Sequence, residues 1–269
     1  MRMFDLHRIA EVCREDVEYF KQYGEWHKCP ISGYIYQNNN ANVLAVAHMD
    51  TVFDKDNHYF YAEGKYVNSG KLDNRIGVYI LLDILPQIGT FDLLLTDLEE
   101  SIQSTASHFK PENDYNWIVE FDRLGHDVVM YNYEDDEMFN LMACYDFPVG
   151  RGTFSDIVEL EYLEIKGFNF GNGTKGQHTT KCSVDLEVLE EQMVKFDIFY
   201  KEMNEVKLPH EIKRGRGYLP ISHKYGYIDE LTSRYYENEK RYLKDGTGYI
   251  YDTERDLWLH ESDIDIEEL

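Results

Sequence analysis

The stretch that decides the fold is Val43-Leu44-Ala45-Val46-Ala47-His48-Met49-Asp50, an apolar run that ends in a histidine and an aspartate. The run is short and follows the polar stretch 38–42, a pattern typical of a buried β-strand. Because open α/β sheets bind ligands at the carboxyl ends of their strands, His48 stands where a functional site is expected. Asp50 can accept a hydrogen bond from the second ring nitrogen and orient the ring. A His-x-Asp pair is also common as an ordinary surface pair, so its meaning depends on the rest of the chain.

Strand and helix patterns alternate along the chain. Strands are expected at 31–37, 91–95, 117–121, 127–133 and 168–170, with a hairpin at 60–68. Helices are expected at 5–23, from 73 to a stop near Pro86, and at 138–145, 154–163 and 186–203. This alternation predicts an α/β fold with a mostly parallel central sheet.

The composition limits the class of function. The chain has 269 residues, 43% of them hydrophobic, which suits one large α/β domain or one domain with a small appendage. Its formal net charge of −24 argues against a nucleic-acid partner, because phosphates are bound by Lys and Arg, and against an anionic membrane surface. Some of the acidic side chains can instead hold divalent cations.

The cysteines and the N-terminal segment indicate a reduced, cytoplasmic setting. No Cys-x-x-Cys pair occurs among Cys13, Cys29, Cys144 and Cys182, so neither a thiolate zinc site nor a thioredoxin-like motif is expected. Residues 1–10 carry charges throughout and lack the apolar segment of a signal peptide. No apolar stretch reaches the roughly 20 residues of a membrane span.

Histidine and acidic side chains lie at the predicted strand ends or in adjoining loops: His48, Asp73, Glu99, Glu100, Asp122 and His178. One edge of the sheet can therefore gather two imidazoles and several carboxylates. Nitrogen and oxygen donors without thiolate suit Zn²⁺, with Mn²⁺ or Co²⁺ as possible substitutes.

Two metal ions at this edge need about two terminal ligands each and a bridging ligand. His178 and Glu100 can hold one ion. His48 and Asp122 can hold the other, and Asp73 can bridge the two.

This arrangement leaves Glu99 without a metal. Glu99 can then act as a general base on a water activated by the metals, while Asp50 holds His48. Adjacent glutamates point in opposite directions in an extended segment, but both can reach one site from a turn. The alternative interpretation of Glu99-Glu100 is a solvated charge pair at the start of a helix.

The order of these motifs resembles that of the co-catalytic di-zinc exopeptidases, which include bacterial leucyl and glutamyl aminopeptidases and related carboxypeptidases. The resemblance covers roughly residues 35–205, and its motifs are His48-x-Asp50, Gly-x-Leu-Asp73-Asn-Arg, Glu99-Glu100, Asp122 and His178. It implies a three-layer α/β sandwich with a central mixed, mostly parallel sheet flanked by helices. It also implies two Zn²⁺ ions and hydrolysis of the N-terminal peptide bond of short peptides.

The spacing of the motifs resembles the compact, single-domain branch of this group. Neither the segment from His48 to Asp73 nor the segment from Asp122 to His178 is long enough for the lid or dimerisation domain that other members insert. The chain departs from the group at 101–104, Ser-Ile-Gln-Ser, where relatives usually have a glycine-containing turn. This departure bears on the local shape of the pocket.

Other reactions fit the same ligands, because the metals contact only the carbonyl of the substrate. The site could serve an N-acyl amino acid deacylase, a carboxypeptidase or a glutaminyl cyclase, each acting on a small peptide or amino-acid derivative. A non-catalytic scaffold of the same fold is a further alternative. The intact set of ligands and base argues against that scaffold.

Arg151 and Asp156 are candidate substrate-binding residues near the predicted helix at 154–163. An arginine can bind a substrate carboxylate, and an aspartate can bind an amine. The structural alternative is that Asp156 and Glu159 form a capping box at the start of this helix.

The character of the chain changes after residue 206. We expect residues 1–206 to form the catalytic domain and residues 207–269, rich in tyrosine and charge, to form an appendage with a small hairpin at 246–251. Tyrosine suits surfaces that pack against a partly hydrated partner surface, and the segment is too short to build much hydrophobic core alone. We therefore expect it to dock on the catalytic domain or on a second subunit of a homo-oligomer.

Overall fold

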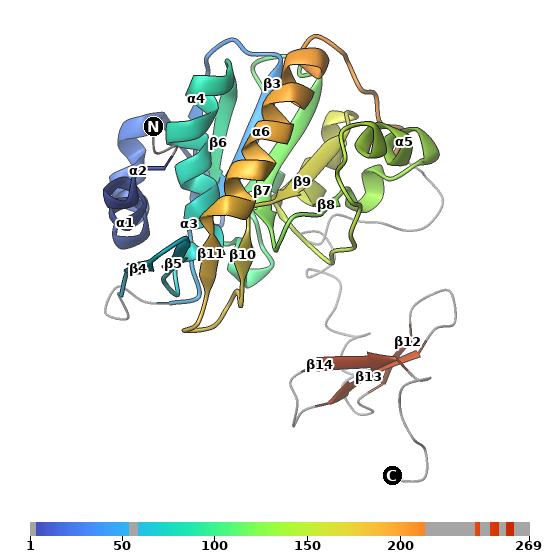
Figure 1. The fold of residues 1–269 in the computed structure, drawn as a ribbon. Helices are drawn as coiled ribbons and strands as arrows, with labels where there is room; N and C mark the ends of the chain where they lie inside the picture. The colour runs from blue at the N-terminus through green and yellow to red at the C-terminus, as the bar shows by residue number, and fades with distance from the viewer. Residues whose placement is uncertain (1–3, 54–58, 213–239, 243–247, 253–256, 261–269) are drawn as a thin grey trace, which may run out of the picture. The chain divides into compact units, whose positions relative to one another are not determined.

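The computed structural model describes residues 4–53, 59–212, 240–242, 248–252 and 257–260. The chain divides into two compact units, Met1–Pro220 and Ile221–Leu269 (Figure 1). None of the helices in the described residues is long and apolar enough to cross a membrane.

The centre of the first unit is a seven-stranded mixed sheet in the order β1-β2-β6-β3-β7-β9-β8. Its strands are β1 (Glu25–Lys28), β2 (Gly33–Gln37), β3 (Val43–His48), β6 (Asp92–Thr96), β7 (Trp117–Arg123), β8 (Val128–Val129) and β9 (Gly167–Gly171). The inner strands β6, β3, β7 and β9 run parallel, and the outer strands join them in antiparallel pairs. The predicted central sheet is confirmed, and the edge strand expected at 127–133 is the short β8.

Helices flank this sheet. The longer ones are α1 (Leu6–Arg14), α3 (Leu72–Tyr79), α5 (Asp136–Cys144) and α6 (Leu186–Met203), with the short α2 (Val17–Phe20) and α4 (Leu85–Ile88). Tight 3₁₀ turns are η1 (Lys21–Tyr23), η3 (Glu99–Ser101), η4 (Thr105–His108), η5 (Tyr131–Tyr133) and η6 (Asp156–Leu163). Helices α3, α4 and α6 cover one face of the sheet (Figure 1). The three-layer α/β architecture expected from the sequence is confirmed.

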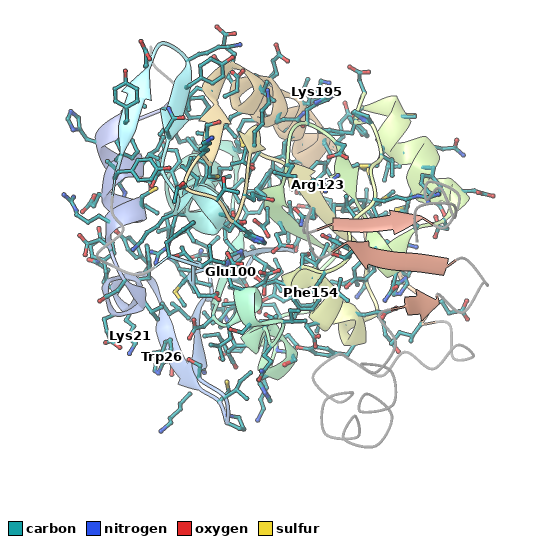
Figure 2. All side chains as sticks on the ribbon, turned by 90° about the horizontal axis from the view of Figure 1, so that it is seen from below. Lys21, Trp26, Glu100, Arg123, Phe154 and Lys195 are labelled. Carbon is teal, nitrogen blue, oxygen red and sulfur yellow. The ribbon has the colours of Figure 1, made fainter. Side chains whose placement is uncertain are left out.

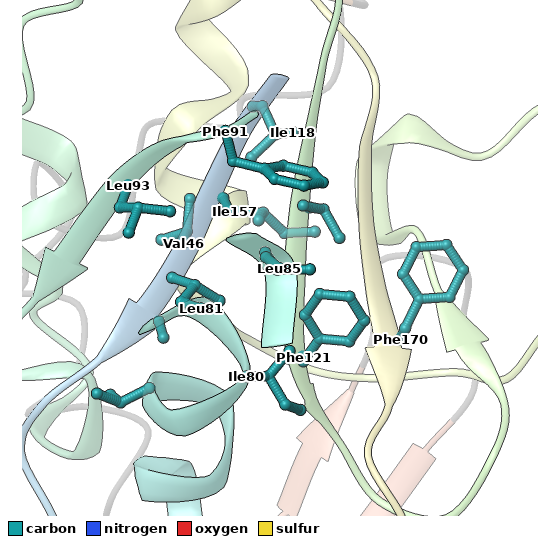
Figure 3. Packing of buried hydrophobic residues seen from close by; sticks show 14 of the residues in the cluster. Val46, Ile80, Leu81, Leu85, Phe91, Leu93, Ile118, Phe121, Ile157 and Phe170 are labelled. Atoms are coloured by element: carbon teal, nitrogen blue, oxygen red, sulfur yellow. The ribbon is translucent and has the colours of Figure 1, made fainter. Parts of the chain in front are cut away.

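The buried face of α6 explains why the sheet and helices pack as they do. Asp185 caps the helix by accepting hydrogen bonds from the backbone N–H groups of Glu187 and Val188. The helix buries a stripe spaced by three and four residues, which includes Met193, Phe196 and Phe199. Figure 3 shows the neighbouring part of this core, with aliphatic and aromatic side chains stacked against the strands. The predicted helix at 186–203 is confirmed.

The helix that begins at Leu72 passes Pro86 instead of ending there. It runs through α3, a π-helical segment η2 (Ile80–Ile84) and α4, and it ends at Ile88. The helix therefore ends two residues beyond Pro86, close to the expected stop. Pro86 is the second residue of α4, and a proline is tolerated in the first turn of an α-helix.

A second, four-stranded sheet connects two segments of the site. Its order is β10-β11-β5-β4, with β4 (Tyr61–Glu63), β5 (Tyr66–Asn68), β10 (Thr174–Lys175) and β11 (Ser183–Asp185). The hairpin expected at 60–68 is therefore confirmed as β4 and β5. Because β5 pairs with β11, the segment before Asp73 lies against the loop that carries His178.

Three other expectations differ from the structure. The N-terminal helix is divided in two, because the side chain of Asp16 caps a new helix, α2, by accepting from the N–H of Tyr19. The segment expected as a helix at 154–163 is the 3₁₀ helix η6. Strand β1 was not predicted, since its residues Glu-Trp-His-Lys show no apolar alternation.

From the sequence, the boundary between the two units is expected after residue 206. The compact units of the structure divide after Pro220. The backbone N–H of Lys166 donates to the carbonyl of Leu208, and the N–H of His210 donates to the carbonyl of Glu164. These hydrogen bonds join residues 207–210 to the first unit. The second unit contains an antiparallel sheet of β12 (Lys240–Tyr242), β13 (Gly248–Asp252) and β14 (Leu257–His260). Residues 246 and 247 of the expected hairpin lie outside the described residues.

Candidate metal centre and its pocket

The candidate site lies at the carboxyl ends of the parallel strands. His48 is the last residue of β3 and pairs in register with Thr96, the last residue of β6. Asp122 lies near the end of β7, on the other side of β3. Because parallel neighbours end at the same edge of a sheet, the groups that follow them converge.

The imidazole of His48 is surrounded by carboxylates. Its Nε2 atom lies 3.5 Å from Asp122 Oδ2, 3.6 Å from Asp73 Oδ1 and 3.7 Å from Glu99 Oε2. These separations are longer than ordinary hydrogen bonds, and the His48 side chain is buried. The atoms therefore point toward a common space without forming close bonds across it.

His178 approaches the same group from the loop between β10 and β11. Its Nε2 atom lies 3.0 Å from Asp73 Oδ2 and 3.1 Å from Glu100 Oε2. Its side chain is 60% exposed, in contrast to the buried His48. Asp73 thus has one oxygen near each histidine, which is the arrangement that a bridging carboxylate requires.

Asp50 connects His48 to the two glutamates. The Nδ1 atom of His48 lies 3.1 Å from the carbonyl oxygen of Asp50 and 3.4 Å from its Oδ1. The carboxylate of Asp50 also accepts hydrogen bonds from the backbone N–H groups of Glu99, at 3.2 Å, and Glu100, at 3.1 Å. The sequence predicted contact between Asp50 and His48, but it did not predict that Asp50 would hold the glutamate turn.

This turn places both glutamates at one site. It is the 3₁₀ turn Glu99–Ser101, and the residues on either side, Leu98 and Ile102, have φ values of 68° and 57°. Non-glycine residues are uncommon in this left-handed region, and a β-branched residue such as isoleucine is especially so. The tight geometry explains how adjacent glutamates can face the same space.

Burial and mutual repulsion shift the pKa values of the carboxylates. Burial is the main cause that raises the pKa of Glu99 to about 8, and the charge of Asp156 contributes to this shift while the charge of His48 opposes it. Burial likewise holds the pKa of Asp122 well above its ordinary value, with Asp73 adding to the shift. The pKa of Asp73 is lowered despite burial, because His178 donates a hydrogen bond to its carboxylate and the charge of His48 acts in the same direction.

The histidines respond in the opposite direction. Hydrogen bonds with Asp73 and Glu100 raise the pKa of His178 to about 10. Burial lowers the pKa of His48, but the charges of Asp122 and Glu99 outweigh burial and hold it well above its ordinary value. The cluster therefore carries excess negative charge that attracts protons or other cations.

The donor set fits divalent cations. His48 Nε2, Glu100 Oε1 and Asp122 Oδ1 are buried and have no hydrogen-bond partner among the described residues. Leaving buried polar atoms unpaired is costly, and bound cations would give these atoms partners. Within the described part of the chain, two groups of donor atoms are close enough to hold an ion: His48 with Glu99 and Asp122, and His48 with Asp73 and Glu100. Glu99, assigned from the sequence as the base, is thus also within reach of a metal.

A cavity of about 480 Å³ opens beside this cluster. Its wall includes four of the acidic side chains, Asp73, Glu99, Glu100 and Asp122, together with His178. The remaining wall is formed by Ile102, Arg123, Leu124, Tyr131, Arg151, Gly152, Thr153, Phe154, Asn169 and Gln177. Glu100, Arg123 and Phe154 are labelled in Figure 2, which views the molecule from the end where the site lies.

The two candidate substrate-binding residues occupy different places. Arg151 is exposed and lines the cavity. Asp156 is fully buried and accepts hydrogen bonds from the hydroxyls of Thr96, at 2.6 Å, and Ser104. Its carboxylate is therefore engaged beneath the site, and it is not part of the cavity wall.

The capping box expected from Asp156 and Glu159 is wrong. The residue that precedes η6 is Ser155, and its side chain makes no capping hydrogen bond. Its hydroxyl instead donates to the buried carboxylate of Glu120 at 2.5 Å. The Ser155 hydroxyl thus binds a buried carboxylate, and the start of η6 has no side-chain cap.

Two cavity residues carried no signal in the sequence. The side-chain oxygen of Asn169 accepts from the backbone N–H of Asp122, and its amide donates to Tyr131. Asn169 lies in the strand expected at 168–170, and Tyr131 lies in the edge strand expected at 127–133. These patterns indicate secondary structure and give no sign of a functional role. Their role depends on the pairing of β9 with β7, which is a long-range contact.

Comparisons with known proteins agree with this architecture. No protein-family model and no curated protein sequence matches the chain. Among solved structures, the aminopeptidase PepT from Bacillus cereus has a TM-score of 0.57 at 10% identity, over 74% of this chain and 99% of that one. A tripeptidase from Staphylococcus aureus has a TM-score of 0.56 at 11% identity, over 73% and 96%.

The chain has the fold of these peptidases. At such low identity the similarity concerns the fold alone. The chemistry depends on the residues of the site itself.

Proposed function

We propose that this protein is a metal-dependent aminopeptidase that hydrolyses the N-terminal peptide bond of short peptides with two Zn²⁺ ions, for which Mn²⁺ or Co²⁺ can substitute. The observation that carries the proposal is the convergence of two imidazoles and four carboxylates with buried, unpartnered donor atoms at one sheet edge. The fold shared with an aminopeptidase and a tripeptidase supports it.

The proposed ligands divide into two sets that share Asp73. His178 and Glu100 would hold one ion, and His48 and Asp122 would hold the other. Asp73 would be shared by both, which is consistent with its two oxygens lying near different histidines.

Glu99 is the proposed general base. When bound, the ions polarise the scissile carbonyl and lower the pKa of water at the site. The carboxylate of Glu99 takes a proton from the attacking water and returns it to the leaving amine. Burial raises the pKa of this carboxylate, and bound cations would lower it again because they favour the ionised form.

Asp50 is the proposed positioning residue. It fixes the ring of His48 and holds the backbone of both glutamates, so it sets the distance between a metal ligand and the base. Errors of about 1 Å in such a distance cost roughly 100-fold in rate.

The experiment that tests the proposal compares Glu99→Gln with wild-type protein on aminoacyl anilides and dipeptides. We expect metal content to stay close to two equivalents while kcat falls by at least 100-fold, since general-base catalysis contributes about 10²–10⁴-fold. Glu191→Gln is the matched control, because Glu191 is exposed on α6. Full activity in the Glu99 variant would show that the base is wrongly assigned, and absence of bound metal would favour a non-catalytic scaffold.

A substrate panel separates the proposal from related reactions. It contains free-amine peptides, N-acyl amino acids, N-terminal glutamine peptides and C-terminally blocked peptides, each with added Zn²⁺, Mn²⁺ or Co²⁺. Preference for N-acyl substrates would favour a deacylase, and loss of activity on C-terminally blocked peptides would favour a carboxypeptidase. Cyclisation of the glutamine peptides would favour a glutaminyl cyclase.

A cytoplasmic location is part of the proposal. All four cysteines are free thiols, which suits a reducing compartment.

A further inference from the structure

The basic side chains in the cavity wall differ in their partners. Arg123 is neutralised by Asp127, with two hydrogen bonds of 2.9 and 3.0 Å between guanidinium and carboxylate. His178 is held between Asp73 and Glu100. Arg151 forms neither an ion pair nor a side-chain hydrogen bond within the part of the chain that the structure describes.

Arg151 stands where two cavities meet. The cavity beside the candidate metal ligands and a second cavity of about 290 Å³ share four wall residues, which are Tyr131, Arg151, Gly152 and Thr153. The second cavity also contains the carboxylate of Glu134, which forms no ion pair with Arg151. A ligand that extends from the candidate metal ligands along the cavity wall therefore passes the guanidinium of Arg151, which is free to bind it.

The charge of the protein gives this guanidinium a specific use. With a net charge of −24 and four carboxylates in the cavity wall, the surroundings of the site repel an anionic ligand. An unpaired arginine in that wall offsets this repulsion at one position. Its planar fork of N–H donors matches the two oxygens of a carboxylate.

We propose that Arg151 binds a carboxylate of the substrate, so that the enzyme selects short peptides that carry a carboxylate near the scissile bond. This inference rests on the proposed peptidase function and names its substrate class. The carboxylate has two possible sources, which are an acidic side chain of the N-terminal residue and the C-terminal group of a di- or tripeptide. Both present the same chemistry to Arg151.

Two substrate pairs, each differing only by carboxylate against carboxamide, identify the source. Glu-Gly-Gly-amide is compared with Gln-Gly-Gly-amide, and Leu-Gly-Gly is compared with Leu-Gly-Gly-amide. The readout is the ratio of kcat/KM within each pair, measured for metal-loaded wild type, Arg151→Gln and Arg151→Lys. Arg14→Gln is the matched control, because Arg14 is an exposed arginine at the end of α1.

We expect wild type to favour the acid about tenfold in one pair, the low end for a charge-assisted hydrogen bond at an exposed group. Arg151→Gln should bring that ratio close to one, and Arg151→Lys should retain part of it. The pair in which the ratio changes identifies the source. The proposal is overturned if wild type shows no preference in either pair, or if the preference survives in Arg151→Gln.

The peptidase proposal can fail separately. Cleavage of the neutral amides by wild type upholds it, whatever the ratios are. If no peptide is cleaved, the peptidase proposal fails, and calorimetric binding of Leu-Gly-Gly, Glu-Gly-Gly-amide and their neutral partners then decides the role of Arg151. Tighter binding of an acid to wild type but not to Arg151→Gln supports the carboxylate site, and equal binding refutes it.

Discussion

Replacing Asp50 with asparagine tests how the site is held together. The two oxygens of Asp50 accept from the backbone N–H groups of Glu99 and Glu100. Asparagine keeps one acceptor oxygen and turns an NH₂ group toward the other N–H. The variant therefore loses one charge-assisted hydrogen bond and leaves one backbone donor facing another donor.

The cost can be worked from this geometry. A hydrogen bond to a charged group contributes about 1.5–3 kcal/mol, and the Asp50 side chain is only 17% exposed, so solvent weakens it little. Its pKa is lowered against the effect of burial, which means that the fold stabilises the ionised form. That stabilisation is present at neutral pH and is lost as the pH falls through the lowered pKa. We expect a loss of about 2 kcal/mol at pH 7, or a melting temperature about 4–8 °C lower.

Metal affinity should change more than stability. Outer groups that orient metal-binding histidines typically contribute 10- to 100-fold in affinity, so we expect zinc binding to weaken by about that factor. Competition with a chromophoric chelator measures the affinity, and calorimetry measures the melting temperature. Asp5→Asn is the control, because Asp5 also accepts from two backbone N–H groups and lies at a helix N-terminus, where asparagine substitutes well. Zinc affinity within about twofold of wild type would refute the positioning role.

Two further predictions follow from the site and from the second unit. Zinc binding should release protons at pH 7 and become tighter as the pH rises, because His178, whose pKa is about 10 before metal binds, must lose its proton to coordinate. Calorimetry in buffers of different ionisation enthalpy measures this proton release. Zinc binding without proton release at pH 7 would contradict the prediction. Removing residues 221–269 should lower solubility or stability, or change the oligomeric state, since we expect this tyrosine-rich unit to dock on the first unit or on a second subunit. Light scattering and thermal melting measure the effect, and a truncated protein that stays monomeric, equally stable and equally active would refute docking.

The central sheet could be predicted from local patterns. The apolar run before His48 and the runs before Glu99 and Asp122 are short and bounded by polar residues, so their strands are visible in the sequence. Parallel strands end at one edge, which explains why the residues after them were expected to meet. The structure brings them together with His178, as the order of motifs implied.

Features that depend on long-range contacts could not be predicted in this way. The support of the His178 loop comes from pairing between β5 and β11, which are more than a hundred residues apart. The buried position of the Asp156 carboxylate depends on hydrogen bonds from Thr96 and Ser104, which approach it only after the chain has folded. Local patterns offered a capping role for Asp156, and tertiary hydrogen bonds replaced it.

In the turn that carries the two glutamates, low backbone strain and the shape of the cavity place opposite demands on residue 102. Leu98 and Ile102 both adopt a left-handed backbone, which costs about 1–2 kcal/mol for a residue with a side chain and almost nothing for glycine. Glycine at position 102 would relax the turn, but it would also remove an apolar group from the cavity wall. An engineer who wanted a more stable protein could make that exchange, and the result would be a cavity with one apolar side chain fewer in its wall. The natural chain has isoleucine at this position and the more strained turn.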